Sequence, residues 1–433
     1  LALIIFGVKT LHHEWRSSYT ILFQETYYKV NLLTLQLKTI FEGVYRPLVA
    51  SREKGLPERR LYVSEKSQNV LMKDLPVNIR KWQRAFLVYP DGQLQQVKAR
   101  HRGDYPGNWA FRRKSWRVKL PKSALIDNIR VFNFVVPNEE AFNNYFSDYV
   151  ARLVGILSPQ DRLVELFIND KSQGIYHELE HVDEGFLRKE GIMPVNIYKG
   201  EQRYREKQIT IANNLFDNPG LWSKVSIFNQ TSESDFSDLE YVLGLIRDAE
   251  TSDDSLVRLK EVAKYEDWAL FSAFQTLVQS WHNGISVNMR LISDPWKGTV
   301  RPMIQDTESF MRLAYNSDHK FDIILDSGRS HPLLSLYHHS SDFLVEKYRI
   351  LYSFVEASLL LKSAQHFESY LPALKRSFSR NYYRYERVFT NPTFVKPGNI
   401  KHILAMTTED GMIAERQRRV DLLRWFQKAL QAK

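Results

Sequence analysis

The chain has 433 residues, of which 43% are hydrophobic, 25% charged and 13% aromatic, so it can bury a large core, and its composition excludes a disordered protein. It contains no cysteine, which excludes disulfides, thiolate zinc sites and cysteine nucleophiles. The 60 basic and 50 acidic residues give a net charge of +10, and the position of this charge carries more information than its sum.

The charge is concentrated in two stretches of opposite sign. Nine Lys and Arg residues lie between positions 98 and 122, against the single acid Asp104. Eight acids against Arg247 lie between positions 231 and 254, where the pattern is typical of a solvated loop and helix face. The basic stretch is either a solvated sheet face or an anion-binding surface. It lacks a recognition helix or an aromatic-interleaved strand motif, so we do not expect a nucleic-acid partner.

The N-terminal segment, residues 1–55, begins with the almost wholly apolar run Leu1 to Val8. A bilayer span needs about 18 apolar residues, so this run fits the end of a truncated membrane anchor or signal segment, followed by a linker. A buried strand or helix fits it equally well.

The first half of the chain predicts α+β structure. Two extended runs, 85–89 and 94–102, flank the Pro90-Asp91-Gly92 turn and predict a hairpin, and alternation at 116–120 predicts a third strand. Apolar residues recur at helical spacing from 142 to 154 and predict an amphipathic helix that ends at Gly155. A second hairpin is expected over 163–168 and 175–180.

The second half predicts mainly helices. Ser237 and Glu240 form a capping-box pattern before one apolar helix face, and a second helix is expected over 268–281. Extended runs at 287–292 and 300–304 then lead to Asp306, and the chain is expected to end in helices, including 413–430.

Four passages, in order, resemble the CotH-type family, the atypical kinase-like proteins named after a bacterial spore-coat protein. The first is Arg100-His101-Arg102-Gly103 followed by Lys114-Ser115-Trp116-Arg117-Val118-Lys119, and the second runs from Gly155 through Val164–Asn169 and Gly174-Ile175-Tyr176 to Glu180 and Phe186-Leu187. The third is Ile197-Tyr198-Lys199, and the fourth runs from His282 through Asn288, Arg290, Gly298 and Pro302 to Asp306.

The resemblance implies a two-lobed, atypical protein-kinase-like α+β fold. It places a β-rich N-terminal lobe with one long helix at 56–205 and a mainly helical C-terminal lobe with the metal site at 206–433. It also implies a kinase that transfers phosphate from ATP to a Ser/Thr protein or surface acceptor, with Mg²⁺ or Mn²⁺ as the metal. A bacterial envelope or extracytoplasmic location is favoured over the cytoplasm, with a protein or envelope component as the partner.

The resemblance also assigns roles to individual residues. Phosphoryl transfer needs cations around the phosphates and a carboxylate that holds the metal. The expected cofactor-binding residues are Arg100, Arg102, Lys114, Glu180, which would hold Lys114 in place, and Lys199. The expected metal ligands are Asp306, Asn288 and Glu308, and the expected catalytic residues are Asn283, His282 and Asp306. Ordinary structural readings also remain: a strand-end ion pair for Glu180, a helix-capping turn at 306–308 and a helix C-cap at His282.

Asn283 departs from the family pattern. Active members carry an aspartate that acts as the catalytic base at this position, and an amide cannot accept the hydroxyl proton. Either His282 substitutes for it, or the chain is a catalytically impaired, nucleotide-binding pseudokinase that serves as a structural or assembly protein of the cell envelope.

The run His177-Glu178-Leu179-Glu180-His181 matches the HExxH motif of zinc metallopeptidases. That chemistry needs a helix, because residues four apart on a strand lie about 13 Å from each other. The alternation from Ile175 favours a strand, and the peptidase is the least favoured alternative.

Overall fold

The computed structural model describes residues 55–75, 81–88, 92–103, 108, 113–137, 141–201, 214–228, 231–278, 280, 282–284, 288–307 and 331–379. The apolar run 1–8, Glu308 and the helix expected at 413–430 lie outside these ranges.

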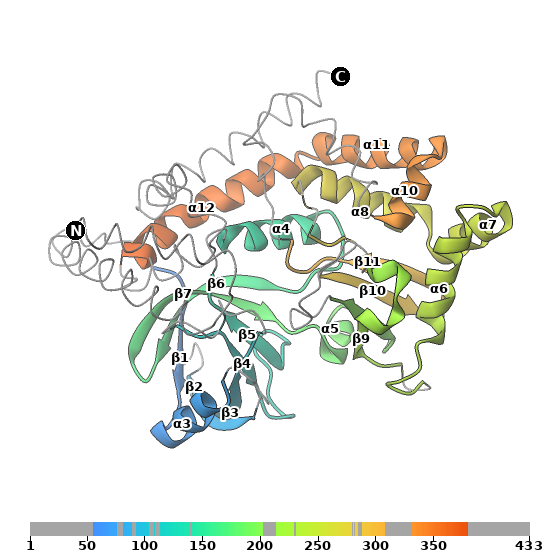
Figure 1. The fold of residues 1–433 in the computed structure, drawn as a ribbon. Coiled ribbons are helices and arrows are strands. Elements are labelled where there is room, and N and C mark those ends of the chain that lie inside the picture. The colour runs from blue at the N-terminus through green and yellow to red at the C-terminus, as the bar shows by residue number, and fades with distance from the viewer. Residues whose placement is uncertain are drawn as a thin grey trace, which may run out of the picture.

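Seven strands form a closed barrel in the order β1-β2-β3-β4-β5-β7-β6 (Figure 1). The chain builds most of it from neighbouring antiparallel strands, and the parallel pairing of β1 with β6 closes it. The barrel strands are β1 (Glu58–Tyr62), β2 (Gln83–Val88), β3 (Leu94–His101), β4 (Trp116–Lys119), β5 (Val131–Val135), β6 (Asp161–Ile168) and β7 (Lys171–Glu180).

Alternation along the strands separates the interior of the barrel from its outer face. In β3 the side chains of Val97 and Ala99 are buried, while Lys98 is exposed and Arg100 is half-buried. The interior is filled by apolar side chains, including Leu61, Leu87 and Phe134, which are completely buried. Burial of each such side chain stabilises the fold by about 1.5–3 kcal/mol. The barrel interior is therefore a packed core, and the basic residues of β3 are left on its outside.

A second sheet of four strands, ordered β11-β10-β8-β9, follows the barrel. The short helix α5 packs on one face of this sheet, in a cluster formed with Ile197, Ile292 and Met303. The large helical core includes Tyr198 and Leu291 from β8 and β10. The strands of this sheet are β8 (Asn196–Gly200), β9 (Trp222–Ser226), β10 (Met289–Asp294) and β11 (Thr299–Met303), and α5 spans Glu184–Lys189.

Helices cover the second sheet and one side of the barrel. The helix α4, between β5 and β6 in the chain, lies under α12 and above β6 in Figure 1. The described helices besides α5 are α3 (Glu65–Lys73), α4 (Ala141–Leu153), α6 (Ser237–Asp248), α7 (Asp253–Val262), α8 (Tyr265–Val278), α10 (Pro332–His338), α11 (Ser341–Glu356) and α12 (Leu359–Ser379), with 3₁₀ turns η3 (Leu215–Asp217) and η4 (Pro219–Leu221).

The expected α+β class is confirmed, but the expected two-lobed kinase-like architecture is wrong. A closed barrel takes the place of the β-rich lobe, and the region after it contains a sheet as well as helices. The reason lies in long-range pairing. Residues 58–61 pair with 165–168 to close the barrel, and β8 pairs with β10 nearly a hundred residues later. Local periodicity indicates strands but does not report which distant strand is the partner.

Most of the expected local elements are confirmed. Both hairpins, the strand at 116–120, the helix at 142–154 and the helix after 237 are present. The capping box at Ser237 is wrong, because Phe236 occupies the N-cap position and the Ser237 backbone N–H is bound by Asp235 Oδ1 at 3.0 Å.

No helix in the described ranges combines the length and the apolar character that crossing a membrane requires.

Candidate functional site

Basic side chains from the barrel and from the second sheet meet at their junction. Arg100 and Arg117 are directly opposite each other on the outer face of β3 and β4, and Arg102 follows β3. On the second sheet, Lys199 of β8 is directly opposite Arg290 of β10. We call these five residues the cation cluster.

His181 follows β7 directly. Arginines from both the barrel side and the second sheet lie close enough to act on its ring. Burial lowers the pKa of the His181 imidazole well below its ordinary value, and the charges of Arg117, Arg102, Arg290 and Arg100 lower it further. Three of these arginines come from the barrel side and one from the second sheet. The field at His181 is therefore strongly positive, and its ring stays neutral at pH 7.

Mutual repulsion is also visible within the cluster. Burial lowers the pKa of Arg290 to about 10, and the nearby Arg102 acts in the same direction, while Glu201 and Asp306 oppose it. Burial likewise lowers the pKa of Lys199, which forms an ion pair with Glu201 and is repelled by Arg290 and Arg102. Positive charge gathered and desolvated in this way favours a polyanionic ligand such as a triphosphate.

Asp306 is the carboxylate of the site, and it is held from two sides. Asn144 of α4 donates from Nδ2 to Asp306 Oδ1 at 2.7 Å, and Asn288 donates from Nδ2 to Oδ2 at 3.2 Å. Both Asp306 (φ 60°) and Asn288 (φ 55°) have left-handed backbone, which is uncommon for residues other than glycine and is often found at functional sites. The expected metal ligands Asp306 and Asn288 are thus adjacent.

His282 is part of the same cluster. Its Nδ1 lies 2.7 Å from the backbone carbonyl of Asp306, and a carbonyl only accepts hydrogen bonds, so Nδ1 carries the proton in this contact. That tautomer leaves Nε2 as the acceptor, and the donor Asn288 Nδ2 lies 3.4 Å from it. The His282 ring is therefore held between the Asp306 backbone carbonyl and the Asn288 amide.

Asn283, in contrast, has a structural position. Its side chain is completely buried, and Nδ2 donates to the backbone carbonyls of Asn288 at 3.0 Å and Gln305 at 2.8 Å. These two bonds fix the loop before β10 to the loop after β11. The amide is required by its surroundings, because a carboxylate in the same orientation would face two other acceptors.

The chemistry of the donors fits a hard divalent cation. The oxygens Asn283 Oδ1, Gln305 Oε1 and Thr307 Oγ1 are buried and have no hydrogen-bond partner within the described part of the chain, and the last two belong to the residues that flank Asp306 in sequence. The described residues contain no group of three or more His, Cys, Asp or Glu side chains that could hold a metal. Mg²⁺ is commonly held by one or two carboxylates together with phosphate oxygens and water, so Asp306 beside the cation cluster is suited to it.

The buried guanidinium of Arg290 is likewise consistent with an anionic ligand. Its Nε is buried without a hydrogen-bond partner among the described residues. Arg290 lowers the pKa of His181, and Asp306 raises the pKa of Arg290, so Arg290 lies between the rest of the cation cluster and Asp306.

Two expected site residues have other surroundings. Glu180 does not hold Lys114: its Oε2 accepts from Lys189 Nζ at 2.6 Å and from the backbone N–H of Gln160 at 3.0 Å. Lys114 acts on His101, whose pKa burial lowers to about 4, with Lys114 next in effect. The His101 ring packs on Trp116, and Lys114 lies close enough to this ring to act on it electrostatically. Glu308 lies outside the described residues.

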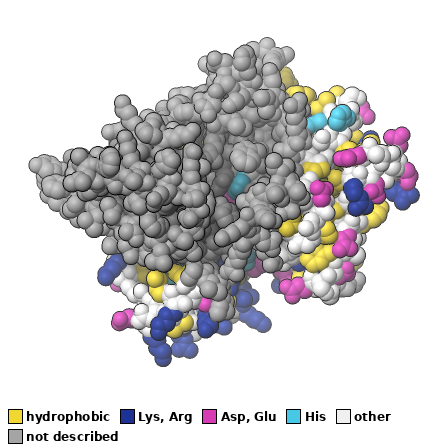
Figure 2. Space-filling view, viewed as in Figure 1, with side chains coloured by type: hydrophobic (Ala, Val, Ile, Leu, Met, Phe, Trp, Pro, Cys, Tyr) yellow, Lys and Arg dark blue, Asp and Glu magenta, His cyan; other side chains and the backbone are white. Residues whose placement is uncertain are grey.

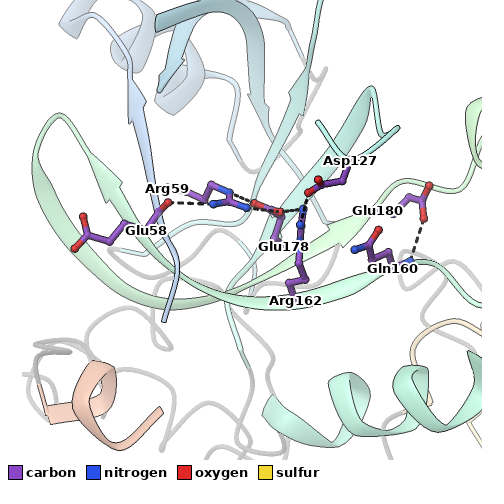
Figure 3. A network of polar contacts seen from close by, with 7 residues as sticks. All are labelled: Glu58, Arg59, Asp127, Gln160, Arg162, Glu178 and Glu180. Atoms are coloured by element: carbon purple, nitrogen blue, oxygen red, sulfur yellow. Dashed lines mark hydrogen bonds and ion pairs between the residues drawn. The ribbon is translucent and has the colours of Figure 1, made fainter. Parts of the chain in front are cut away.

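Figure 3 shows Glu180 with Gln160, separate from a buried ion network on the same strand. In that network Glu178 is bound by Arg59, with Nε 2.5 Å from Oε2, and by Arg162, which also pairs with Asp127. The network joins β1, β6 and β7, so its role is to fasten the strands that close the barrel.

The HExxH residues lie on a strand and not on a helix. Residues 171–180 form β7, and His177 Nδ1 is 2.7 Å from Asp161 Oδ2. His181, four residues on, lies instead among the arginines of the cation cluster. The helical arrangement that a zinc peptidase requires is absent at these described residues.

Arg290, Arg117, His181 and Asn144 were not assigned to the site from the sequence. Arg290 and Arg117 lie within the passages that carry the family resemblance, so the sequence did contain a signal for them. Asn144 gave none, because an asparagine in an amphipathic helix is ordinary and its partner is more than 160 residues away.

A comparison with protein families supports the resemblance seen in the sequence. The model of the family described as CotH kinase protein matches residues 99–326, which is more than half of the chain. A search of curated proteins found no match. The matched region contains the whole cation cluster, His181, His282, Asn288 and Asp306. The chain therefore belongs to the CotH kinase protein family.

Proposed function

We propose that this chain is a metal-dependent phosphotransferase that uses ATP and transfers its γ-phosphoryl group to a Ser or Thr hydroxyl of a protein or envelope component. The observation that carries the proposal is the meeting of the cation cluster with Asp306. Arg102 from the barrel side and Lys199 from the second sheet lie within electrostatic reach of Arg290, as do the carboxylates of Asp306 and Glu201. Membership of the CotH kinase protein family supports ATP as the phosphate donor.

In this proposal the residues divide the work between phosphate and metal. ATP would supply the phosphoryl group, and bound Mg²⁺ or Mn²⁺ would neutralise part of the negative charge on its phosphates. Arg100, Arg102 and Arg290 bind phosphate oxygens, and their charge stabilises the transition state. Asp306, oriented by Asn144 and Asn288, binds the metal. The acceptor oxygen forms a bond to the γ-phosphorus as the bond from that phosphorus to the β–γ bridging oxygen breaks.

His282 is the residue that we propose takes the proton of the acceptor hydroxyl. Its Nδ1 contact with the Asp306 carbonyl leaves Nε2 as the acceptor. Asn283 is fully buried and its amide is engaged with two carbonyls, so it does not contribute a base.

A second candidate function is nucleotide binding without efficient transfer, as in a structural or assembly protein of the cell envelope. It is favoured by the same observation on Asn283, because loss of a general base typically lowers a rate by about 10²- to 10⁴-fold.

Replacement of Asp306 tests the site itself. In Asp306→Ala we expect the Mg²⁺-dependent thermal shift with ATP to disappear and phosphate transfer to fall by at least about 100-fold, since even outer-shell partners of a metal are worth 10- to 100-fold. Transfer is measured with labelled ATP and a generic Ser/Thr substrate. Asp254→Ala, on the exposed surface of α7, is the matched control and should behave as wild type. Unchanged nucleotide binding in Asp306→Ala would refute the site.

His282→Gln separates the two candidate functions. If His282 is the base, this variant binds nucleotide normally but loses transfer by about 10²- to 10⁴-fold. If wild type shows the thermal shift and no transfer at all, the second candidate holds.

A further inference from the structure

Three basic side chains stand directly opposite one another across the outer face of the barrel. Arg84 of β2 is paired with Lys98 of β3, and Lys98 is paired with Lys119 of β4. Arg84 and Lys98 are exposed and Lys119 is half-buried. We call these three residues the basic ladder. In Figure 2, Lys and Arg side chains gather at the lower end of the molecule, where Figure 1 places β2, β3 and α3.

This arrangement is unfavourable for the fold. Like charges directly opposite on neighbouring strands destabilise a sheet, because the Cβ atoms of opposite residues lie about 5 Å apart. In the described part of the chain no acidic side chain forms an ion pair or hydrogen bond with Arg84, Lys98 or Lys119. The repulsion is therefore not balanced within the described protein. It would be balanced by an anionic partner.

The basic ladder is continuous with the cation cluster. The next outward-facing row, two residues further along β3 and β4, is the Arg100–Arg117 pair. A ligand chain lying along β3 would thus pass from the basic ladder directly to the junction with the second sheet.

On its other side the basic ladder borders exposed apolar side chains. Phe86, 37% exposed, and Leu94, 60% exposed, face the same way as Arg84 and Lys98 along β2 and β3. Trp82 also lies beside this face, but the guanidinium of Arg100 covers its ring, with 4.4 Å between the Arg100 Cζ atom and the ring centroid. Single-stranded nucleic acids are typically bound by several open aromatic rings on which successive bases stack, and on this face Phe86 is the one exposed aromatic ring among the described residues of β2 and β3. An acidic polypeptide with apolar residues matches both parts of the surface.

We propose that the basic ladder, with Phe86 and Leu94, docks an acidic segment of the polypeptide acceptor that also carries apolar side chains, and directs the following hydroxyl toward Asp306. The inference rests on the proposed phosphotransferase function and adds the class of acceptor. Arg84 and Lys98 lie before the region that matches the family, so the proposed docking role of these two residues does not come from the family match.

The test is a binding measurement that needs no nucleotide. A labelled peptide rich in Glu and Leu with one Ser, and a matched peptide with Lys in place of Glu, are titrated with the full chain and followed by fluorescence anisotropy. We expect the acidic peptide to bind and the Lys peptide not to bind. In Arg84→Gln/Lys98→Gln/Lys119→Gln the affinity for the acidic peptide should fall by about tenfold or more. The melting temperature should stay the same or rise, because the repulsion is removed.

A variant with the same loss of charge elsewhere is the control. Lys171, Lys264 and Lys362 are exposed, and Lys171→Gln/Lys264→Gln/Lys362→Gln should bind the acidic peptide as wild type does. Equal affinity in the ladder and control variants would overturn the proposal. So would ladder-dependent binding of single-stranded oligo(dT) without binding of the acidic peptide, or a lower melting temperature in the ladder variant.

The ATP-dependent thermal shift, measured on the same samples, keeps the two proposals apart. It should be unchanged in the ladder variant, because the replaced residues are not in the cation cluster. If wild type binds the acidic peptide through the basic ladder but shows no shift with ATP, the proposed function fails and the docking surface stands. If wild type shows a thermal shift with ATP but does not bind the acidic peptide, the docking surface fails and the proposed nucleotide site stands.

Discussion

At the scale of single residues, Asn283 decides how the site is interpreted. An amide donor at this position joins two loops through the carbonyls of Asn288 and Gln305, and its side chain has no access to solvent. An aspartate at this position would therefore not simply supply a base. The protein around this position is built for a donor.

We expect Asn283→Asp to destabilise the protein by about 1–3 kcal/mol without raising phosphate transfer, because two buried carbonyls lose their donor and a carboxyl is buried in its place. Urea unfolding and the transfer assay are the measurements. Asn128→Asp, on the exposed surface, should stay within about 0.5 kcal/mol of wild type. A large gain in transfer at unchanged stability would contradict this structural role.

At the scale of elements, α4 connects the site to the helical part of the molecule. Its Tyr145 hydroxyl lies 2.9 Å from His366 Nε2 of α12, and the ring of Tyr149 stacks on His366 with 3.9 Å between centroids. From the same helix Asn144 reaches Asp306. The packing of α4 against α12 therefore fixes the position of a hydrogen bond to the carboxylate.

Asn144 is expected to act on metal affinity more than on stability. In Asn144→Ala the apparent Kd for Mn²⁺ in the presence of ATP should rise by about 10- to 100-fold, as is typical when a partner of a metal ligand is removed. Ser147→Ala is the matched control, since Ser147 is buried on the same helix and its hydroxyl has no hydrogen-bond partner among the described residues. If both variants shift the Kd equally, the effect comes from the packing of α4 and not from the amide.

At the scale of the whole molecule, buried neutral histidines make stability depend on pH. Burial lowers the pKa of His101 to about 4 and that of His331 to about 3. The unfolded chain takes up protons at these histidines below about pH 6.5, while the folded chain does not, so stability falls as the pH drops from 6.5 toward the folded pKa values. At pH 5 each of these two histidines lowers the free energy of unfolding by about 2 kcal/mol.

The measurement is the difference between wild type and His331→Phe in urea unfolding at pH 7 and pH 5. Burial raises the pKa of Asp148 and of Glu180, and this acts in the opposite direction, so the wild-type pH dependence alone does not isolate the histidines. His331 lies among Phe216, Trp268 and Phe271, which makes phenylalanine a compatible replacement. The variant should lose about 2 kcal/mol less than wild type between the two pH values. An identical loss in both proteins would show that His331 does not titrate on unfolding.

The sequence by itself determined the local elements, the concentration of positive charge at 98–122 and the family. These follow from short-range properties: alternation for β3 and β4, helical spacing for α4, and motifs such as the run from His282 to Asp306. It also placed Arg100, Arg102, Lys199 and Asp306 in one site through the family resemblance. Of these four, Arg102, Lys199 and Asp306 interact electrostatically with Arg290, and the assignment of all four to one nucleotide site stays a prediction.

Only the tertiary structure decided the architecture and the partners within the site. The pairing of β1 with β6, the sheet that joins β8 to β10 and the bond from Asn144 to Asp306 all link residues that are nearly a hundred or more positions apart. Likewise, Glu180 binds Lys189 and not Lys114, and the buried Asn283 side chain donates to the backbone carbonyl of Gln305. Local sequence patterns fix which face of an element is buried, but the element that covers this face depends on how the whole chain closes and packs.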